Sequence, residues 1–202
     1  MRLLTIVYLP MRYLLLFFIL FFSFQKISWS IDIQNDFLIA KPGMLDLRFK
    51  ETVIFMFYHN QEGAAGLVVN KPIQTISISE LFVASNLVPP KKIETKEVIL
   101  HWGGPVESDH VFFIHSPEYK SKDFISSNKD FTITRSAEVL FDIASNKGPE
   151  NYLILSGIAV WSPGQLDYEM EQNSWDKKTN NFIPLFDNVD DMWSRIINSQ
   201  EI

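Results

Sequence analysis

The sequence predicts a single α+β domain, in which helices flank a mixed β-sheet, preceded by a separate hydrophobic segment. Short apolar runs of strand length alternate irregularly with stretches of helical period. Hairpins neighbour one another, without the regular strand–helix–strand order of a parallel α/β sheet. The chain has 202 residues, 47% hydrophobic and 21% charged, which is typical of one globular domain. It has no cysteine, which excludes disulfides, thiolate zinc sites and cysteine nucleophiles.

The first 30 residues differ in composition from the rest. They contain no acidic residue, and Arg2 and Arg12 precede an apolar run from Leu14 to Phe22. Ser28-Trp29-Ser30 then matches a small-x-small cleavage pattern. This order predicts a signal peptide or membrane anchor over residues 1–30, and with it export or membrane tethering. A start codon placed too far upstream is the alternative.

Residues 31–202 are acidic. All 24 acidic residues lie in this part, whereas three of the 18 basic residues lie in the first 30, so its formal charge is −9. Such a surface repels a phosphate backbone unless a local basic patch overrides it, and the lysines are scattered in pairs. Direct binding of nucleic acid is therefore not expected.

The first predicted elements form a β-hairpin. Residues 52–58 (TVIFMFY) are a continuous apolar run, typical of a strand buried on both faces. Residues 59–63 have turn composition, and residues 64–70 (AAGLVVN) return as a second strand. Lys71-Pro72 ends that strand, because proline has no N–H for a central ladder.

A helix and another pair of strands follow. Ser77 and Glu80 fit a capping box before an apolar helix that ends near Leu87. Residues 97–102 and 111–115 are short strands, and the GGPVESD sequence between them predicts a tight, glycine-dependent reversal.

The last predicted elements are a helix and a strand. Residues 136–145 have an amphipathic pattern, which Lys147-Gly148-Pro149 ends. Residues 151–161 form the most hydrophobic strand.

The next residues, Ser162-Pro163-Gly164-Gln165, hold either a catalytic serine or a structural corner. A nucleophile elbow uses the N–H of the residue after the serine as an oxyanion donor, and Pro163 has none. With Ser162 as N-cap, Pro163 at the first helical position and Gln165 at the third, the same residues complete a capping box. We therefore predict that Ser162 and Pro163 cap a helix.

The four histidines do not predict a metal site. His101, His110 and His115 are 9 and 5 residues apart, which matches no compact metal motif, and His59 lies in the predicted turn. Gly103-Gly104-Pro105 lacks the spacing of a nucleotide-binding loop. We expect no metal and no cofactor, and the spacing leaves open a site assembled from distant segments.

Four segments resemble the AlgH/YqgE-like family of bacterial proteins in order and spacing. They are FLIAKPGMLDLRFKETVIFMFYHN, EGAAGLVVNKP, HWGGPVESDHVFFIHS and GIAVWSPGQLDYEMEQNSW. The resemblance covers about residues 35–185 and so places an AlgH/YqgE-like domain at residues 31–202. It implies an α+β fold with a bent, branched sheet flanked by helices. It also implies a cytoplasmic location as the family norm, and some members carry a label as transcriptional regulators.

The positions that match the family pattern supply a candidate ligand or partner cleft. Most of them are glycine, proline, asparagine or tryptophan, which more often fix backbone geometry and packing than perform chemistry. The leading interpretation is a non-catalytic binding or regulatory protein with an unknown protein or small-molecule partner. One alternative is a hydrolase of unknown substrate using His59, His115 and Glu169. Another is a transcriptional regulator, which the acidic charge disfavours as a direct DNA binder. The candidate cleft residues are His59, Asn70, Lys71, Gly103, Gly104, His115, Gln165, Glu169 and Asn173.

Overall fold

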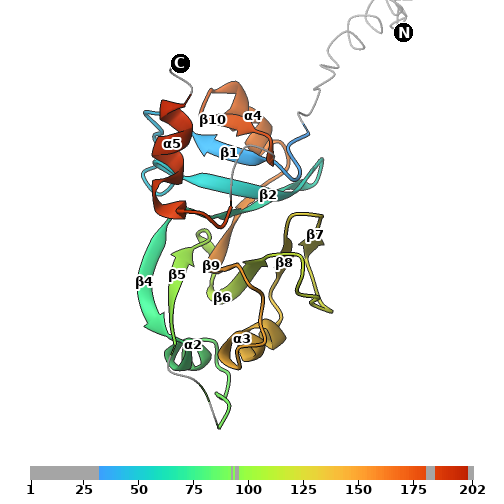
Figure 1. Ribbon diagram of the computed structural model, residues 1–202. Coiled ribbons are helices and arrows are strands. Elements are labelled where there is room, and N and C mark those ends of the chain that lie inside the picture. The colour runs from blue at the N-terminus through green and yellow to red at the C-terminus, as the bar shows by residue number, and fades with distance from the viewer. Residues whose placement is uncertain (1–31, 92, 94–95, 181–184, 200–202) are drawn as a thin grey trace, which may run out of the picture. The chain divides into compact units, whose positions relative to one another are not determined.

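Figure 1 shows the computed structural model of the protein, which describes residues 32–91, 93, 96–180 and 185–199. The predicted signal peptide or membrane anchor of residues 1–30 lies outside these ranges. Within them, no helix has the length and apolar character needed to span a membrane.

The described strands form one mixed sheet that branches at β9 (Tyr152–Trp161). β4 (Pro72–Ser77) and β5 (Glu97–Trp102) form an antiparallel pair, and β5 joins the sheet by parallel pairing with β9. The other strand pairs are antiparallel. The main path runs in the order β10 (Trp175–Lys178), β1 (Phe37–Ala40), β2 (Val53–Asn60), β3 (Gly63–Val68), β9, β6 (Val106–His115), β8 (Thr132–Thr134) and β7 (Ser126–Ser127).

β9 changes its neighbours at Gly157. Before that residue β9 lies between β5 and β6, and after it Ala159 to Trp161 pair with β3. Gly157 has φ +77°, a backbone conformation that side chains with a Cβ rarely adopt. One glycine thus lets a single strand serve two parts of the sheet.

The predicted hairpin of residues 52–70 is confirmed as β2 and β3, although its turn is shorter than expected. His59 and Asn60 belong to β2, and only Gln61 and Glu62 connect the strands. The apolar part of β2, Val53 to Phe57, is buried on both faces, as its continuous apolar run predicts. Phe55 faces one apolar cluster, with β6, β8 and β9, and Met56 faces another, with Trp161 and Trp175.

Four α-helices are present in the described ranges. The predicted capping box of Ser77 and Glu80 begins α2 (Ile78–Ala84), and Ser136 caps α3 (Ala137–Ala144). These two helices lie side by side at one end of the sheet (Figure 1). The rings of Phe82 and Phe141 make an edge contact between them. At the other end lie α4 (Gln165–Glu171) and α5 (Met192–Asn198), the latter after a 3₁₀ turn at Val189–Asp191. The predicted α+β class with a mixed sheet and helices is confirmed.

Candidate functional site

An aromatic cluster lies where β9 ends and β10 begins. Trp161 is the last residue of β9 and Trp175 the first of β10, and their ring centroids are 6.2 Å apart in an edge-on arrangement. Phe49, from the connection of residues 41–52 between β1 and β2, packs against both rings with centroids 6.4 and 5.8 Å away. Trp102, the last residue of β5, lies 5.5 Å from Phe49 on the same cluster. Four segments distant in sequence therefore meet at one point.

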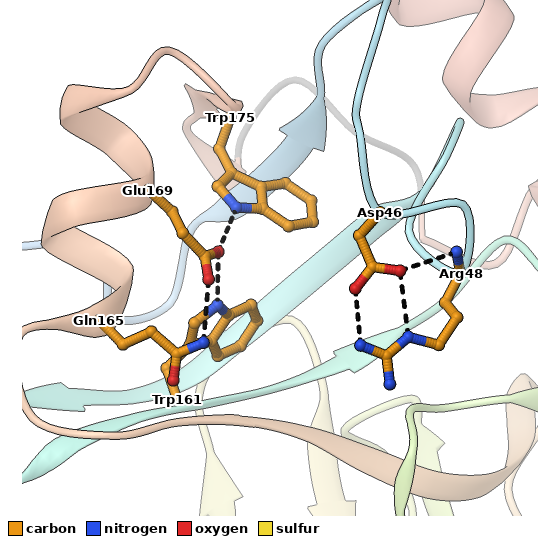
Figure 2. A network of polar contacts seen from close by, with 6 residues as sticks. All are labelled: Asp46, Arg48, Trp161, Gln165, Glu169 and Trp175. Carbon is orange, nitrogen blue, oxygen red and sulfur yellow. Dashed lines mark hydrogen bonds and ion pairs between the residues drawn. The ribbon is translucent and has the colours of Figure 1, made fainter.

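Glu169 ties this cluster to α4. Its Oε2 accepts hydrogen bonds from the indole N–H groups of Trp161 and Trp175, each at 2.9 Å, as Figure 2 shows. Its Oε1 accepts a third bond of 2.9 Å from the Nε2 of Gln165, one turn earlier on the helix. Three neutral donors thus fix the position of one carboxylate.

An ion pair lies across from Glu169 (Figure 2). The guanidinium of Arg48 binds the Asp46 carboxylate through two parallel bonds, Nε to Oδ1 at 3.0 Å and Nη2 to Oδ2 at 2.6 Å. The Arg48 guanidinium beside Asp46 lowers the pKa of that carboxyl group. Both residues belong to the 41–52 loop, so the pair also gives the loop a defined shape.

A cleft of about 400 Å³ opens between this loop and the aromatic cluster. We call it the Glu169 cleft. One wall is the loop, from Met44 to Phe49, and the other is formed by Trp161, Gln165, Glu169 and Trp175. A neighbouring hollow of about 410 Å³ shares Met44, Leu45 and Glu169 with the Glu169 cleft.

The structure brings three of the nine predicted cleft residues together. Gln165 and Glu169 line the Glu169 cleft, and Asn173 lines the neighbouring hollow. The side-chain oxygen of Asn173 accepts a hydrogen bond from Lys41, which also pairs with Asp176 at 3.1 Å. The other six residues line neither of these two hollows.

Four of those six hold the backbone together. The buried side chain of Asn70 accepts a bond from the Val53 N–H at 2.7 Å and donates one to the Glu51 carbonyl at 3.0 Å. The carbonyl of Lys71 accepts a bond from the Trp102 N–H. Gly103 and Gly104 lie so close to β9 that a Cβ on either would overlap its backbone.

The remaining two are the histidines of the hydrolase alternative, and they lie at opposite ends of β9. His59 pairs with Ala64, which pairs with Trp161, whereas His115 pairs with Tyr152. Those two positions are nine residue steps apart along β9, roughly 30 Å of extended chain. The Nε2 of His59 lies 3.7 Å from Asp167, and the Nδ1 of buried His115 lies 2.9 Å from the Ser116 carbonyl oxygen. Neither of these contacts involves Glu169, so the three residues do not form one site.

The prediction that Ser162 is an N-cap is wrong. α4 begins at Gln165, and its N-cap is Gly164, at φ +73° and without a side-chain bond. Ser162 and Pro163 instead form a turn, in which the Ser162 carbonyl accepts a bond from the Gln165 N–H. Only half of the capping box is present, from the Ser162 N–H to the Gln165 side-chain oxygen at 3.1 Å. The physical reason is Gly164, which can adopt the left-handed conformation and so delays the start of the helix.

Sequence reasoning missed the 41–52 loop. Asp46, Arg48 and Phe49 lie outside every predicted strand and helix, and the aromatic partners of Phe49 lie far along the chain. One feature of the sequence could have indicated the tryptophan–glutamate cluster. Trp161, Glu169 and Trp175 all match the family pattern and lie close together in sequence, and two buried indole N–H groups require acceptors.

Within the described ranges, no group of three or more histidine, aspartate or glutamate side chains is arranged to hold a metal ion.

The fold is that of an α+β protein with a branched sheet, and comparison with known proteins shows which family it belongs to. Residues 37–202 match the AlgH-like family, and the chain belongs to this family. A UPF0301 protein of Thiobacillus denitrificans is 36% identical over 146 residues, covering 72% of this chain and 77% of that protein. A UPF0301 protein of Jannaschia sp. is 37% identical over 146 residues, covering 71% and 75%.

Two solved structures are similar to this one. The solution structure of the AlgH protein from Pseudomonas aeruginosa has a TM-score of 0.71 and 30% identity, covering 87% of this chain and 92% of that one. A crystal structure of a Corynebacterium diphtheriae protein has a TM-score of 0.63 over 85% and 88% of the two chains. At 17% identity, that second similarity shows a shared fold.

Proposed function

We propose that this protein is a non-catalytic binding protein whose ligand or partner occupies the Glu169 cleft. The observation that supports the proposal is the fixed position of Glu169, whose carboxylate accepts three hydrogen bonds from neutral donors at the wall of the cleft. Such a pre-organised acceptor loses little entropy when a ligand binds, which favours recognition.

The same geometry argues against hydrolysis at this cleft. Acid–base catalysis of hydrolysis usually needs a second titratable group beside the first, but the other carboxylate in the lining, Asp46, is bound to Arg48. Ser174 is a hydroxyl in the lining, and the lining contains no histidine that could activate it. The cleft therefore has a recognition group without the usual machinery for turnover.

The rim of the cleft also favours binding. Leu45, on the 41–52 loop, is 95% exposed, and Val160, on the opposite wall, is 50% exposed. Exposed apolar side chains that gather around a cleft mark interaction surfaces. A regulatory role would then act through this binding, and the formal charge of −9 disfavours direct contact with DNA.

The indole N–H groups offer a direct test, because each tryptophan gives its own signal in a ¹⁵N NMR spectrum. We expect at least one compound from a mixed set of cationic, neutral and anionic metabolites to shift the signals of Trp161 and Trp175. The internal control is Trp193, whose indole N–H donates to the Ala40 carbonyl outside this cleft. The bound compound should be recovered unchanged. Conversion of the compound would contradict a non-catalytic role, and shifts confined to other parts of the protein would rule out this cleft.

A further inference from the structure

We infer that the ligand of the Glu169 cleft carries an organic cation, an ammonium or guanidinium group on an apolar stem, with Glu169 as its counter-charge. This inference rests on the proposed function, because it assigns a chemical class of ligand to the same cleft. It follows from the charges around the cleft, the remaining acceptor capacity of Glu169, and the apolar surroundings of that carboxylate.

The charges around the cleft leave Glu169 unbalanced. Arg48 is paired with Asp46 through two bonds, and Lys41, in the neighbouring hollow, is paired with Asp176 at 3.1 Å. Among the described residues, Glu169 has hydrogen bonds from neutral groups and no ion pair. The neutral donors fix the carboxylate without cancelling its charge, so the cleft has one net negative charge available to a ligand.

Glu169 can still accept another hydrogen bond. An ionised carboxylate has about four lone-pair sites, two on each oxygen. Oε2 uses both of its sites for Trp161 and Trp175, whereas Oε1 uses only one, for Gln165. One acceptor site on Oε1 therefore remains for a ligand donor, and a charged N–H donor makes the strongest bond to a carboxylate.

The surroundings of this carboxylate strengthen its attraction for a cation. Trp161 and Trp175 are buried, and their N–H donors are already bound to Glu169. The two tryptophans therefore have no N–H donor left for an anionic ligand. Their rings also keep water away from one side of the carboxylate, and charges interact more strongly in such surroundings than in water.

The apolar rim suits a stem that carries the cation. Met44, Leu45 and Val160 line the Glu169 cleft without a polar side-chain group to contact. A short alkyl chain against these residues would remove apolar surface from water while its charged end reaches Glu169. A lysine or arginine side chain of another protein and a free alkylamine share this chemistry.

A titration of the full chain with probes of one stem length tests the inference. The probes are n-butylammonium, n-butylguanidinium, n-butanol and butyrate, followed by the Trp161 and Trp175 indole signals. We expect the two cations to bind with dissociation constants on the order of millimolar and the neutral and anionic probes to bind at least about tenfold more weakly. Added salt should weaken the cations alone. The peptide acetyl-Leu-Lys-Leu-amide then distinguishes a lysine side chain of another protein from a free amine. Tighter binding of this peptide than of n-butylammonium indicates a peptide partner, and its norleucine analogue, which has no charged group, is the control.

Variants with opposite expected effects on cation binding make the test more specific. Glu169→Gln should abolish the preference for cations, whereas Glu171→Gln, which removes the same charge from an exposed position on α4, should leave it unchanged. Arg48→Gln frees the Asp46 carboxylate, so cation binding should tighten by roughly threefold, and a site for anions would respond in the opposite direction.

Equal binding of butanol and butylammonium, or tighter binding of butyrate, would overturn the inference. This comparison uses the wild-type protein, so it decides the question even if Glu169→Gln fails to fold. If the cations leave both indoles unshifted while a neutral or anionic metabolite shifts them, the ligand class is wrong and the proposed binding function stands.

Discussion

Asn70 and Glu169 are both polar residues that match the family pattern, and their roles differ because their surroundings differ. Asn70 is only 4% exposed, and both ends of its amide are bound to the backbone of the segment that leads into β2. Glu169 is half-buried and borders two hollows. The sequence shows that a polar residue matches the family pattern, and the burial of that residue indicates whether it stabilises the fold or is available to a ligand.

Replacing Asn70 tests the structural role. Asn70→Ala leaves the buried Val53 N–H and the Glu51 carbonyl without their partner, so we expect a loss of roughly 2–3 kcal/mol in the free energy of unfolding. Urea denaturation measures it. The matched control is Asn60→Ala, since Asn60 is exposed and accepts one bond, from the Glu62 N–H, within the hairpin turn. That control should stay within about 0.5 kcal/mol of wild type, and an equal loss in both variants would contradict the role of Asn70.

At the scale of elements, the strands with long apolar runs could be predicted from the sequence, and the strands defined by their partners could not. β2, β3 and β9 carry their own hydrophobic signal. β4 is mostly exposed and begins with proline, and β10 (WDKK) has one apolar residue in four, so both are strands because a neighbour pairs with them. The same limit applies to the Glu169 cleft. The wall formed by α4 could be predicted from the sequence through Gln165 and Glu169. The wall formed by the loop could not, because Phe49 is placed by contacts with tryptophans more than 50 residues away.

The approach of β5 to β9 gives a prediction at this scale. A Cβ at Gly103 would overlap the carbonyl oxygen of Gly157, and rigid backbone on both sides leaves little room for a shift. Gly103→Ala should therefore lower the free energy of unfolding by about 3 kcal/mol or prevent folding. Gly164→Ala is the control, because its Cβ would meet nothing within 4 Å and only the positive φ of +73° is unfavourable. It should cost about 1–2 kcal/mol. Thermal unfolding of the two variants gives the comparison, and a Gly103→Ala loss no larger than that of the control would contradict close packing here.

At the scale of the whole molecule, carboxylates with lowered pKa values and a buried histidine both make stability fall as the pH falls, but in different pH ranges. Hydrogen bonds from the Ser77 side chain lower the pKa of Glu80, and Arg48 lowers that of Asp46. Carboxylates with lowered pKa values stabilise the folded state above their ordinary values of 4.5 and 3.8, and this contribution is lost as the pH falls below them. A loss of stability between pH 7 and 5 must therefore come from another group.

His101 is that group. It is 3% exposed on β5, and burial lowers its pKa below 6.5, outweighing the opposite effects of the Ile154 backbone and the Asp190 carboxylate. The unfolded chain therefore binds a proton at a higher pH than the folded protein, and stability falls as the pH drops below about 6.5. The slope approaches about 1.4 kcal/mol per pH unit until His101 is protonated in the folded state as well.

Removing the imidazole should flatten this dependence. We expect the free energy of unfolding of His101→Leu, measured by urea denaturation at several pH values, to change less between pH 7.5 and 5 than that of wild type. The control is His110→Gln, which removes an exposed imidazole from the middle of β6 and should keep the wild-type slope. Below pH 4.5 all three proteins should lose stability together, because Asp46 and Glu80 are present in each. A His101→Leu slope equal to that of wild type between pH 7.5 and 5 would show that protonation of this buried imidazole is not coupled to unfolding.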